Sequence, residues 1–351
     1  MITKIFNCIS IHNGGGIIYL AMMHSDIDKK GNLILLDHRA KNKLKQFKYA
    51  ELRFLRKSLF RNLFILILRI NKKIIFRKYL MRTNKKEYLS EYYLNGIPPL
   101  FRFPLSSNRI FIFCQNKNIF NYINCLNKNL FFKIKFHIYH LLHIFLINNF
   151  LKDTDTIIVQ TSSMKKSISN LKPKNNILIK DHYWRALTKD FFDFNLENKN
   201  INYQNNQLSI LEKIAKSNKL FFYPASFEPH KNHKILFDVF KTLSKNSFNN
   251  IKLLVTINSN EIPKKYRKIN QIIFLGNQKQ STIYNIYKIA DFLIFPSINE
   301  SLGLPLIEAK LHKLPIIASN LDYVYDVCSP KYTFNPYSKE DIYYKIVESI
   351  V

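Results

Sequence analysis

A regular alternation of short apolar runs and helical segments is the feature of this sequence that most restricts its fold. In residues 207–351, apolar runs long enough for one buried strand alternate with segments of helical periodicity. The predicted strands are Leu220–Tyr223, Ile251–Ile257, Gln271–Leu275, Phe292–Phe295 and Leu314–Ala318, and the predicted helices are Asn232–Leu243, Ser281–Ile289 and Pro305–His312. This alternation predicts an α/β domain built on a parallel sheet.

The same alternation is weaker in the first half of the chain. It consists of predicted strands Ile2–Ser10, Asn32–Leu36, Arg109–Cys114 and Thr156–Gln160, a glycine-rich turn at Asn13–Gly16 and a helix over Ile17–Asp28. A long basic region between the third and fourth of these strands is predicted to be helical. We therefore predict a first domain over 1–190, an asparagine-rich linker over 191–206 and a second domain over 207–351. Two such domains predict a ligand site in the cleft between the carboxyl ends of their sheets.

Composition limits the class of protein. The chain has 351 residues, of which 47% are hydrophobic and 14% aromatic, so it is globular. A formal charge of +30 indicates an anionic partner such as nucleic acid, a membrane surface or a phosphate-bearing substrate, or else a drift of the whole composition toward Lys, Asn and Ile. The four cysteines lack metal-site spacing, and neither a signal peptide nor a spanning apolar run is visible. We expect a cytoplasmic protein that does not span a membrane.

The segment FPSINESLGLPLIEAK, residues 295–310, combines the end of a strand, a glycine turn and the start of a helix. Pro305 suits the first turn of a helix, and the free N–H groups of Leu302, Gly303 and Leu304 form a potential anion site. Glu300 precedes this turn and Glu308 follows it. Carboxylates beside a phosphate site suit the hydroxyls of a sugar and a ribose. From spacing alone, two solvated glutamates remain an equal alternative.

The segment FFYPASFEPHKNHKIL, residues 221–236, places Lys231 where a strand leads into a helix. A lysine at such a junction can clamp a phosphate as a point charge. In a chain this basic, a surface lysine at a helix start is the simpler reading.

These segments resemble a known family. PSINESLGLPLIEAKLHKLPIIAS is similar to the E-x7-E signature of retaining GT-B glycosyltransferases of glycosyltransferase family 4 (group 1), and the segment around Lys231 resembles that family's donor-phosphate loop. The resemblance implies that Glu300 contacts the transferred sugar, that Glu308 contacts the nucleotide ribose and that Lys231 binds the donor diphosphate. Ser226 stands where many members have an arginine, so the usual Arg/Lys pair is incomplete.

The first half of the chain also resembles this family. HNGGGIIYL is similar to its glycine-rich loop, which implies that Gly15 and Gly16 approach the donor phosphates. Gln115 and Asn116 occupy the neighbourhood in which many relatives carry a histidine, so no histidine receives that role. Family members generally need no metal, and we expect none here, with a nucleotide-diphosphate sugar as co-substrate.

The resemblance implies a GT-B fold, with two Rossmann-like parallel-sheet domains facing a central cleft: an acceptor-binding first domain and a nucleotide-sugar-binding second domain. The expected reaction is transfer of a hexose, with retention, to a glycan or lipid-linked glycan acceptor in bacterial surface-polysaccharide synthesis (lipopolysaccharide O-antigen or capsule). Two alternatives stay open: a nucleotide-sugar epimerase of GT-B fold and a basic, non-catalytic nucleic-acid-binding protein. The second leaves the pairing of Glu300 with Glu308 without a purpose.

The segment Lys41–Glu87 carries sixteen Lys and Arg residues against two Glu, interleaved with apolar runs. A basic helical region with an apolar stripe is typical of contact with an anionic bilayer. The alternative is a solvated helical face enriched in lysine by compositional drift. The first reading adds the inner face of the cytoplasmic membrane as a partner.

Overall fold

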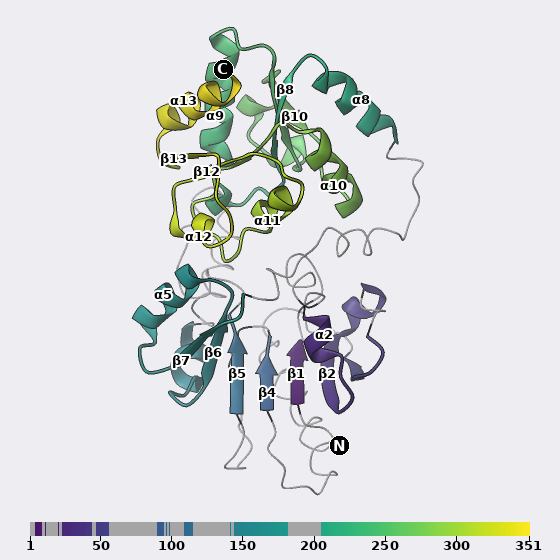
Figure 1. The fold of residues 1–351 in the computed structure, drawn as a ribbon, viewed down its shortest axis with the longest axis vertical. Coiled ribbons are helices and arrows are strands. Elements are labelled where there is room, and N and C mark those ends of the chain that lie inside the picture. Colours follow the sequence, from purple (N-terminus) through teal and green to yellow (C-terminus); the bar gives the residue numbers. More distant parts are fainter. Residues whose placement is uncertain are drawn as a thin grey trace, which may run out of the picture. The chain divides into compact units, whose positions relative to one another are not determined.

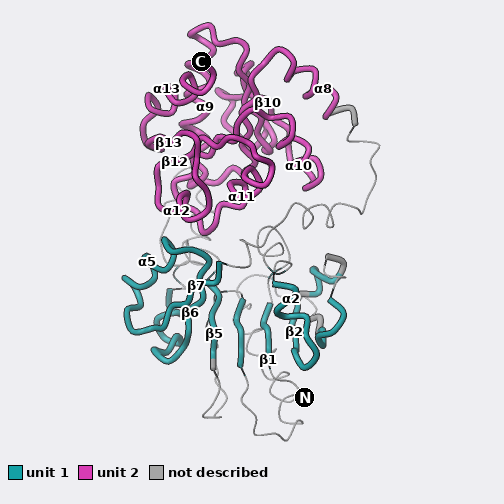
Figure 2. Tube along the Cα trace, in the orientation of Figure 1, with its two compact units in different colours: residues 1–122, 129–186 teal, residues 123–128, 187–351 magenta. Residues whose placement is uncertain are grey.

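The computed structural model divides the chain into two compact units. It describes residues 4–8, 11, 20, 23–43, 47–55, 90–94, 96, 98, 109–114, 141, 144–181 and 205–351. Unit 1 comprises residues 1–122 and 129–186, and unit 2 comprises residues 123–128 and 187–351 (Figure 2). The predicted linker lies outside the described residues except for Asn205 and Asn206, which begin helix α8.

Unit 1 contains a seven-stranded sheet in which every pairing is parallel, in the order β3-β2-β1-β4-β5-β6-β7 (Figure 1). Its strands are β1 (Lys4–Cys8), β2 (Asn32–Asp37), β3 (Glu51–Leu55), β4 (Ser90–Tyr93), β5 (Arg109–Phe113), β6 (Thr156–Val159) and β7 (Asn176–Ile179). Its named helices are α2 (His24–Ile27), the 3-10 helix η1 (His38–Lys43) and α5 (Ser162–Leu171). The hydroxyl of Thr161 accepts the N–H of Met164 and caps the start of α5.

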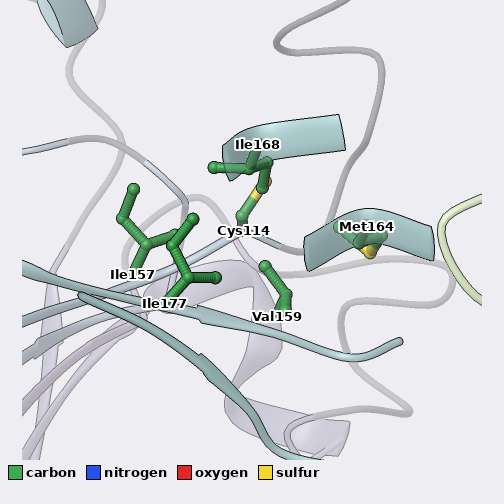
Figure 3. Packing of buried hydrophobic residues seen from close by; sticks show 6 residues of the cluster. All are labelled: Cys114, Ile157, Val159, Met164, Ile168 and Ile177. Atoms are coloured by element: carbon green, nitrogen blue, oxygen red, sulfur yellow. The ribbon is translucent and has the colours of Figure 1, made fainter. Parts of the chain in front are cut away.

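Helix α5 packs on the sheet through a small apolar cluster (Figure 3). Met164 and Ile168 lie one helical turn apart and therefore share a face of α5. They contact side chains from the sheet and from the residue that follows β5: Cys114, Ile157, Val159 and Ile177. This burial holds α5 against the strands.

The predicted helical character of the basic segment Lys41–Glu87 is wrong for residues 51–55. Residues 51–55 form strand β3, which pairs in parallel with β2, and residues 90–93 form β4. The buried Asp28 carboxylate accepts the N–H groups of Lys48, Tyr49 and Ala50, each at 2.8 Å, and fixes the turn before β3. The pattern of charges favours a helix here, but the pairing of β3 with β2 and the turn held by Asp28 stabilise a strand instead. Residues 56–89 lie outside the described residues.

Unit 2 contains a six-stranded, all-parallel sheet in the order β10-β9-β8-β11-β12-β13. Its strands are β8 (Lys219–Tyr223), β9 (Ile251–Val255), β10 (Ile272–Phe274), β11 (Phe292–Phe295), β12 (Ile316–Ser319) and β13 (Tyr332–Phe334). Its helices are α8 (Asn205–Ala215), α9 (His233–Lys245), α10 (Gln280–Ile289), α11 (Leu304–Leu311), α12 (Asp322–Tyr325) and α13 (Lys339–Ile350), with the 3-10 helices η3 (Pro229–Lys231), η4 (Ser259–Glu261) and η5 (Lys264–Tyr266). The predicted α/β class with two parallel sheets is confirmed.

The core of unit 2 explains its sequence pattern. All four residues of β11 and of β12 are buried, because helices cover both faces of a parallel sheet. Helix α9 buries Leu236, Phe237, Phe240 and Leu243 along one face. Helix α13 packs against α9 and β13 and buries Ile342 and Ile346.

The strand order of unit 2 fixes where a ligand would bind. Strands β9 and β10 lie on one side of β8, whereas β11, β12 and β13 lie on the other. The connections therefore leave β8 and β11 in opposite directions, and open α/β sheets bind their ligands at the carboxyl ends of strands where the order reverses in this way. The loops that follow β8 and β11 carry Lys231 and Glu300. Within the described ranges, no helix is long and apolar enough to cross a membrane.

Candidate functional site

The structure brings Lys231 and Glu300 together at the carboxyl ends of β8 and β11. Lys231 ends η3, and Glu300 lies in the loop between β11 and α11. The Lys231 Nζ donates to Glu300 Oε1 at 2.5 Å, and the two side chains are 17% and 10% exposed. Two residues separated by 69 positions thus form one mostly buried ion pair.

Backbone contacts hold the two loops in register. The N–H of Ile298 donates to the carbonyl of His230 at 2.9 Å, which ties the loop after β11 to η3. Asn232 adopts the left-handed conformation, with a φ of 58°, and so turns the chain from η3 into α9. The Asn232 side-chain amide donates to the carbonyl of Pro336 at 2.7 Å. These hydrogen bonds therefore fix the position of the turn that carries Lys231.

The Glu300 carboxylate is oriented by two donors on the same oxygen. Besides Lys231, the hydroxyl of Ser297 donates to Glu300 Oε1 at 2.7 Å. Within the part of the chain that the structure describes, no donor binds Oε2. An anchored carboxylate with one open oxygen can accept a hydrogen bond from a ligand hydroxyl.

Two buried tyrosines support Ser297. The Tyr323 hydroxyl donates to the Ser297 carbonyl at 2.6 Å, and the Tyr223 hydroxyl lies 3.1 Å from the Ser297 hydroxyl. Burial raises the pKa of both phenols well above the usual range, and the negative charge of Glu300 raises it further. Both therefore remain protonated and able to donate near neutral pH.

The glycine turn leaves backbone donors open at the start of α11. Gly303 has a φ of 69° and is the N-cap of α11, followed by Leu304 and Pro305. The Gly303 carbonyl accepts the N–H of Leu306 at 2.9 Å. Among the contacts of residues 205–351, the N–H groups of Leu302, Gly303 and Leu304 donate to no protein acceptor. Such groups at the positive end of a helix favour an anion.

Glu308 has a separate set of supports. It lies on α11, is 8% exposed, and accepts hydrogen bonds from Gln280 on Oε1 and from the Tyr287 hydroxyl on Oε2, each at 2.8 Å. Burial raises the pKa of this carboxyl, and these two hydrogen bonds oppose the rise. Among the described residues, no hydrogen bond joins Glu308 to Glu300 or Lys231. Each oxygen keeps a second lone pair for a ligand hydroxyl.

Of the remaining residues predicted for the site, the structure describes Ser226 but not Gly15 and Gly16. Ser226 is exposed in the loop between β8 and η3. Burial and the charge of Lys231 lower the pKa of the nearby His230 to about 4, so that His230 is neutral at pH 7. Gly15, Gly16, Gln115 and Asn116 lie outside the described residues. Across the described ranges, no group of three His, Cys, Asp or Glu side chains is placed to hold a metal ion.

Sequence reasoning missed the residues that support the two carboxylates. Tyr223 appears in the sequence as one more apolar strand residue, and Gln280 and Tyr287 as parts of an amphipathic helix. Their hydroxyl and amide groups meet Ser297 and Glu308 only through the strand order and the packing of α10 beside α11. Of these supporting residues, only Ser297 was indicated by the sequence, because it closely follows a predicted buried strand.

Comparison with known families locates a match in the unit that holds this site. Residues 207–347 match the family model described as glycosyl transferases group 1. No curated protein matches the sequence significantly.

Solved structures resemble the whole chain. The structure of HepE from Anabaena in complex with UDP and glucose has a TM-score of 0.62 and 14% identity, with 100% of this chain and 90% of that one covered. WaaG, a glycosyltransferase involved in lipopolysaccharide biosynthesis, has a TM-score of 0.60 and 12% identity, with 99% and 90% covered. Sucrose-phosphate synthase from Thermosynechococcus elongatus has a TM-score of 0.63 and 12% identity, also with 99% and 90% covered.

At these identities the likeness establishes the fold, and the predicted GT-B fold is confirmed. The matched family segment, residues 207–347, includes Lys231, Glu300 and Glu308. The chain therefore has the GT-B fold, and its second unit matches the glycosyl transferases group 1 family.

Proposed function

We propose that this protein is a retaining glycosyltransferase that transfers a hexose from a nucleotide-diphosphate sugar to a glycan or lipid-linked glycan acceptor. The observation that carries the proposal is the Lys231–Glu300 pair at the carboxyl ends of β8 and β11, in a segment that matches the glycosyl transferases group 1 family. The HepE structure, which contains UDP and glucose, supports a nucleotide-sugar donor.

The described residues suit the departure of a nucleoside diphosphate. The bond between the anomeric carbon and the diphosphate oxygen breaks, and negative charge develops on that oxygen. The Lys231 ammonium group and the N–H groups of Leu302, Gly303 and Leu304 would stabilise this charge. Lysine and a helix N-terminus can supply this stabilisation without a metal, so we expect transfer to continue in the presence of a chelator.

The two glutamates would hold the neutral parts of the donor. Glu300 would accept a sugar hydroxyl on its open Oε2, and Glu308 would accept the ribose hydroxyls. The acceptor hydroxyl forms the new bond on the face that the diphosphate leaves, and its proton passes to the departing diphosphate oxygen. Retention and the hexose class rest on the resemblance of the motif around Glu300 and Glu308.

The first half of the chain would serve the acceptor. We assign residues 1–190 to an acceptor-binding domain, residues 207–351 to the donor domain, and Gly15 and Gly16 to the donor phosphates. Ser226, in the loop between β8 and η3, would contact the donor. The basic segment Lys41–Glu87 would bring the enzyme to the inner face of an anionic membrane, where bacterial lipopolysaccharide or capsule precursors are assembled. WaaG, which is involved in lipopolysaccharide biosynthesis, has a similar fold.

The experiment is product analysis with a panel of UDP-, GDP-, ADP- and dTDP-hexoses, with and without lipid-linked glycan acceptors. We expect acceptor-dependent release of nucleoside diphosphate, unaltered by chelator, and a product whose anomeric configuration by NMR equals that of the donor. Conversion of the donor sugar without acceptor would indicate an epimerase instead. Salt-dependent DNA binding without nucleotide-sugar binding would indicate a nucleic-acid-binding protein.

A further inference from the structure

We infer that Tyr223 is a positioning residue whose buried hydroxyl holds Lys231 and, through Ser297, Glu300 in their working arrangement. This inference rests on the proposed function, because it concerns the same site. It adds a residue from the interior of the sheet that need not touch the donor.

Tyr223 lies at the meeting point of the two functional loops. It ends β8, is fully buried, and packs against the ring of Phe295, the last residue of β11, with ring centroids 5.7 Å apart. Its hydroxyl donates to the backbone carbonyl of Lys231 at 2.7 Å and lies 3.1 Å from the hydroxyl of Ser297. One oxygen atom therefore contacts both the loop after β8 and the loop after β11.

The placement of protons fixes a direction along this chain of contacts. A carbonyl oxygen cannot donate, so the Tyr223 hydroxyl is the donor in its 2.7 Å contact with the Lys231 carbonyl. An ionised carboxylate cannot donate either, so the Ser297 proton points to Glu300 Oε1 at 2.7 Å. The Ser297 oxygen, 3.1 Å from the Tyr223 oxygen, then accepts a weaker share of the Tyr223 proton in a bifurcated hydrogen bond. The result is a connected set from the Lys231 backbone to the Glu300 carboxylate.

Loss of the Tyr223 hydroxyl would loosen both reacting groups without removing either. The backbone hydrogen bond from Ile298 to His230 would still join the two loops, so the fold would survive. The Lys231 carbonyl and the Ser297 hydroxyl would lose their common neighbour. Misplacement of positioned groups lowers the rate of the chemical step more than it weakens ground-state binding.

The chain offers two matched controls, both buried tyrosines with a hydroxyl near a carboxylate. The Tyr287 hydroxyl donates to Glu308, the proposed ribose ligand, at 2.8 Å. The Tyr266 hydroxyl donates to the Asp238 carboxylate on α9 at 3.3 Å, and in the described part of the chain it makes no hydrogen bond to Lys231 or Glu300. The substitutions Tyr223→Phe, Tyr287→Phe and Tyr266→Phe each remove a single oxygen atom.

The experiment measures kcat and donor KM for these three variants with the best donor and acceptor of the panel. For Tyr223→Phe we expect kcat to fall about tenfold or more, with donor KM within about threefold of wild type. For Tyr287→Phe we expect donor KM to rise severalfold with kcat unchanged, since a ribose contact is equally strong in ground and transition states. Tyr266→Phe should lower only the Tm.

A double variant separates positioning from general loss of stability. If Tyr223 and Ser297 act as one unit, Tyr223→Phe in a Ser297→Ala background should reduce kcat much less than it does in the wild type. Additive losses, or wild-type kcat in Tyr223→Phe, would overturn the inference while leaving the proposed function standing. A wild-type chain inactive with every donor would overturn both.

Discussion

The Lys231 ammonium group binds one oxygen of the Glu300 carboxylate, and the other oxygen has no donor among the described residues. In the proposed reaction, this asymmetry would give the pair two separate tasks. Two further N–H groups of Lys231 would bind the diphosphate, and Glu300 Oε2 would accept a sugar hydroxyl.

Substitution of either member of the pair should remove most transfer. We expect Lys231→Ala and Glu300→Gln each to lower kcat/KM by about a hundredfold or more, because each removes a group that acts on the developing charge or on the sugar. Lys231→Ala should also cost about 1–2 kcal/mol of stability, since it leaves a mostly buried carboxylate without its cation. Glu300→Gln should cost less, because an amide oxygen still accepts from Ser297.

Steady-state assays and thermal unfolding check both expectations. Circular dichroism would confirm that each variant is folded. Wild-type activity in either variant would remove that residue from the proposed mechanism.

His233 should make unit 2 sensitive to acid. Its ring is buried among Tyr223, Phe227 and Phe237, and neither nitrogen has a partner at hydrogen-bond geometry among the described residues. Burial and then Lys231 lower its pKa to about 3, although the nearby Ala225 backbone opposes the fall. Below pH 6.5 the His233 side chain is protonated in the unfolded chain but stays neutral in the folded chain until about pH 3. Stability is therefore full above pH 6.5 and falls toward pH 3, by up to about 1.4 kcal/mol per pH unit.

The variant His233→Phe should flatten this acid loss, because phenylalanine keeps the aromatic contacts and cannot be protonated. Urea unfolding between pH 4 and 7 measures the slope. The exposed His38 provides a control, and His38→Gln should retain the wild-type slope. Equal slopes in wild type and His233→Phe would contradict this account.

At the scale of elements, the turn before α11 depends on a glycine in the left-handed conformation. Gly303 has a φ of 69°, and a Cβ atom there would lie 3.0 Å from Leu306 Cδ1 and 3.6 Å from Phe295. We expect Gly303→Ala to cost about 1 kcal/mol or more in unfolding free energy. Donor KM should also rise, because the neighbouring N–H groups would shift. Calorimetry and initial rates test both. Gly276→Ala, at another left-handed glycine, should lower stability alone.

Local patterns predicted most elements of unit 2 and far fewer of unit 1. The run FLIF forms β11 at the predicted bounds, and β8, β9 and α10 differ from prediction by one or two residues. The strands β3, β4, β7 and β13 were missed. Each contains at least one polar residue, and pairing with a parallel neighbour supplies its stability. For the site, the motif around Glu300 was visible in the sequence. The supports Tyr223, Gln280 and Tyr287 depend on contacts between residues far apart in the chain.

At the scale of the whole molecule, the central claim is that unit 2 binds a nucleotide-diphosphate sugar through Lys231. Its sheet order places the loops of Lys231 and Glu300 at the carboxyl ends of strands where the order reverses, which is where open α/β sheets bind their ligands. A ligand that binds only the folded state raises the Tm, with about 2.7 kcal/mol of stabilisation at a hundred times its Kd.

The most direct measurement is the thermal shift of wild type, Lys231→Ala and Lys241→Ala with the panel of nucleotide-diphosphate hexoses. Lys241 is an exposed lysine on α9, the helix that follows η3, and controls for the loss of a positive charge. We expect at least one donor to raise the Tm of wild type and of Lys241→Ala but not that of Lys231→Ala. No shift with any donor, or an equal shift in all three proteins, would contradict the account.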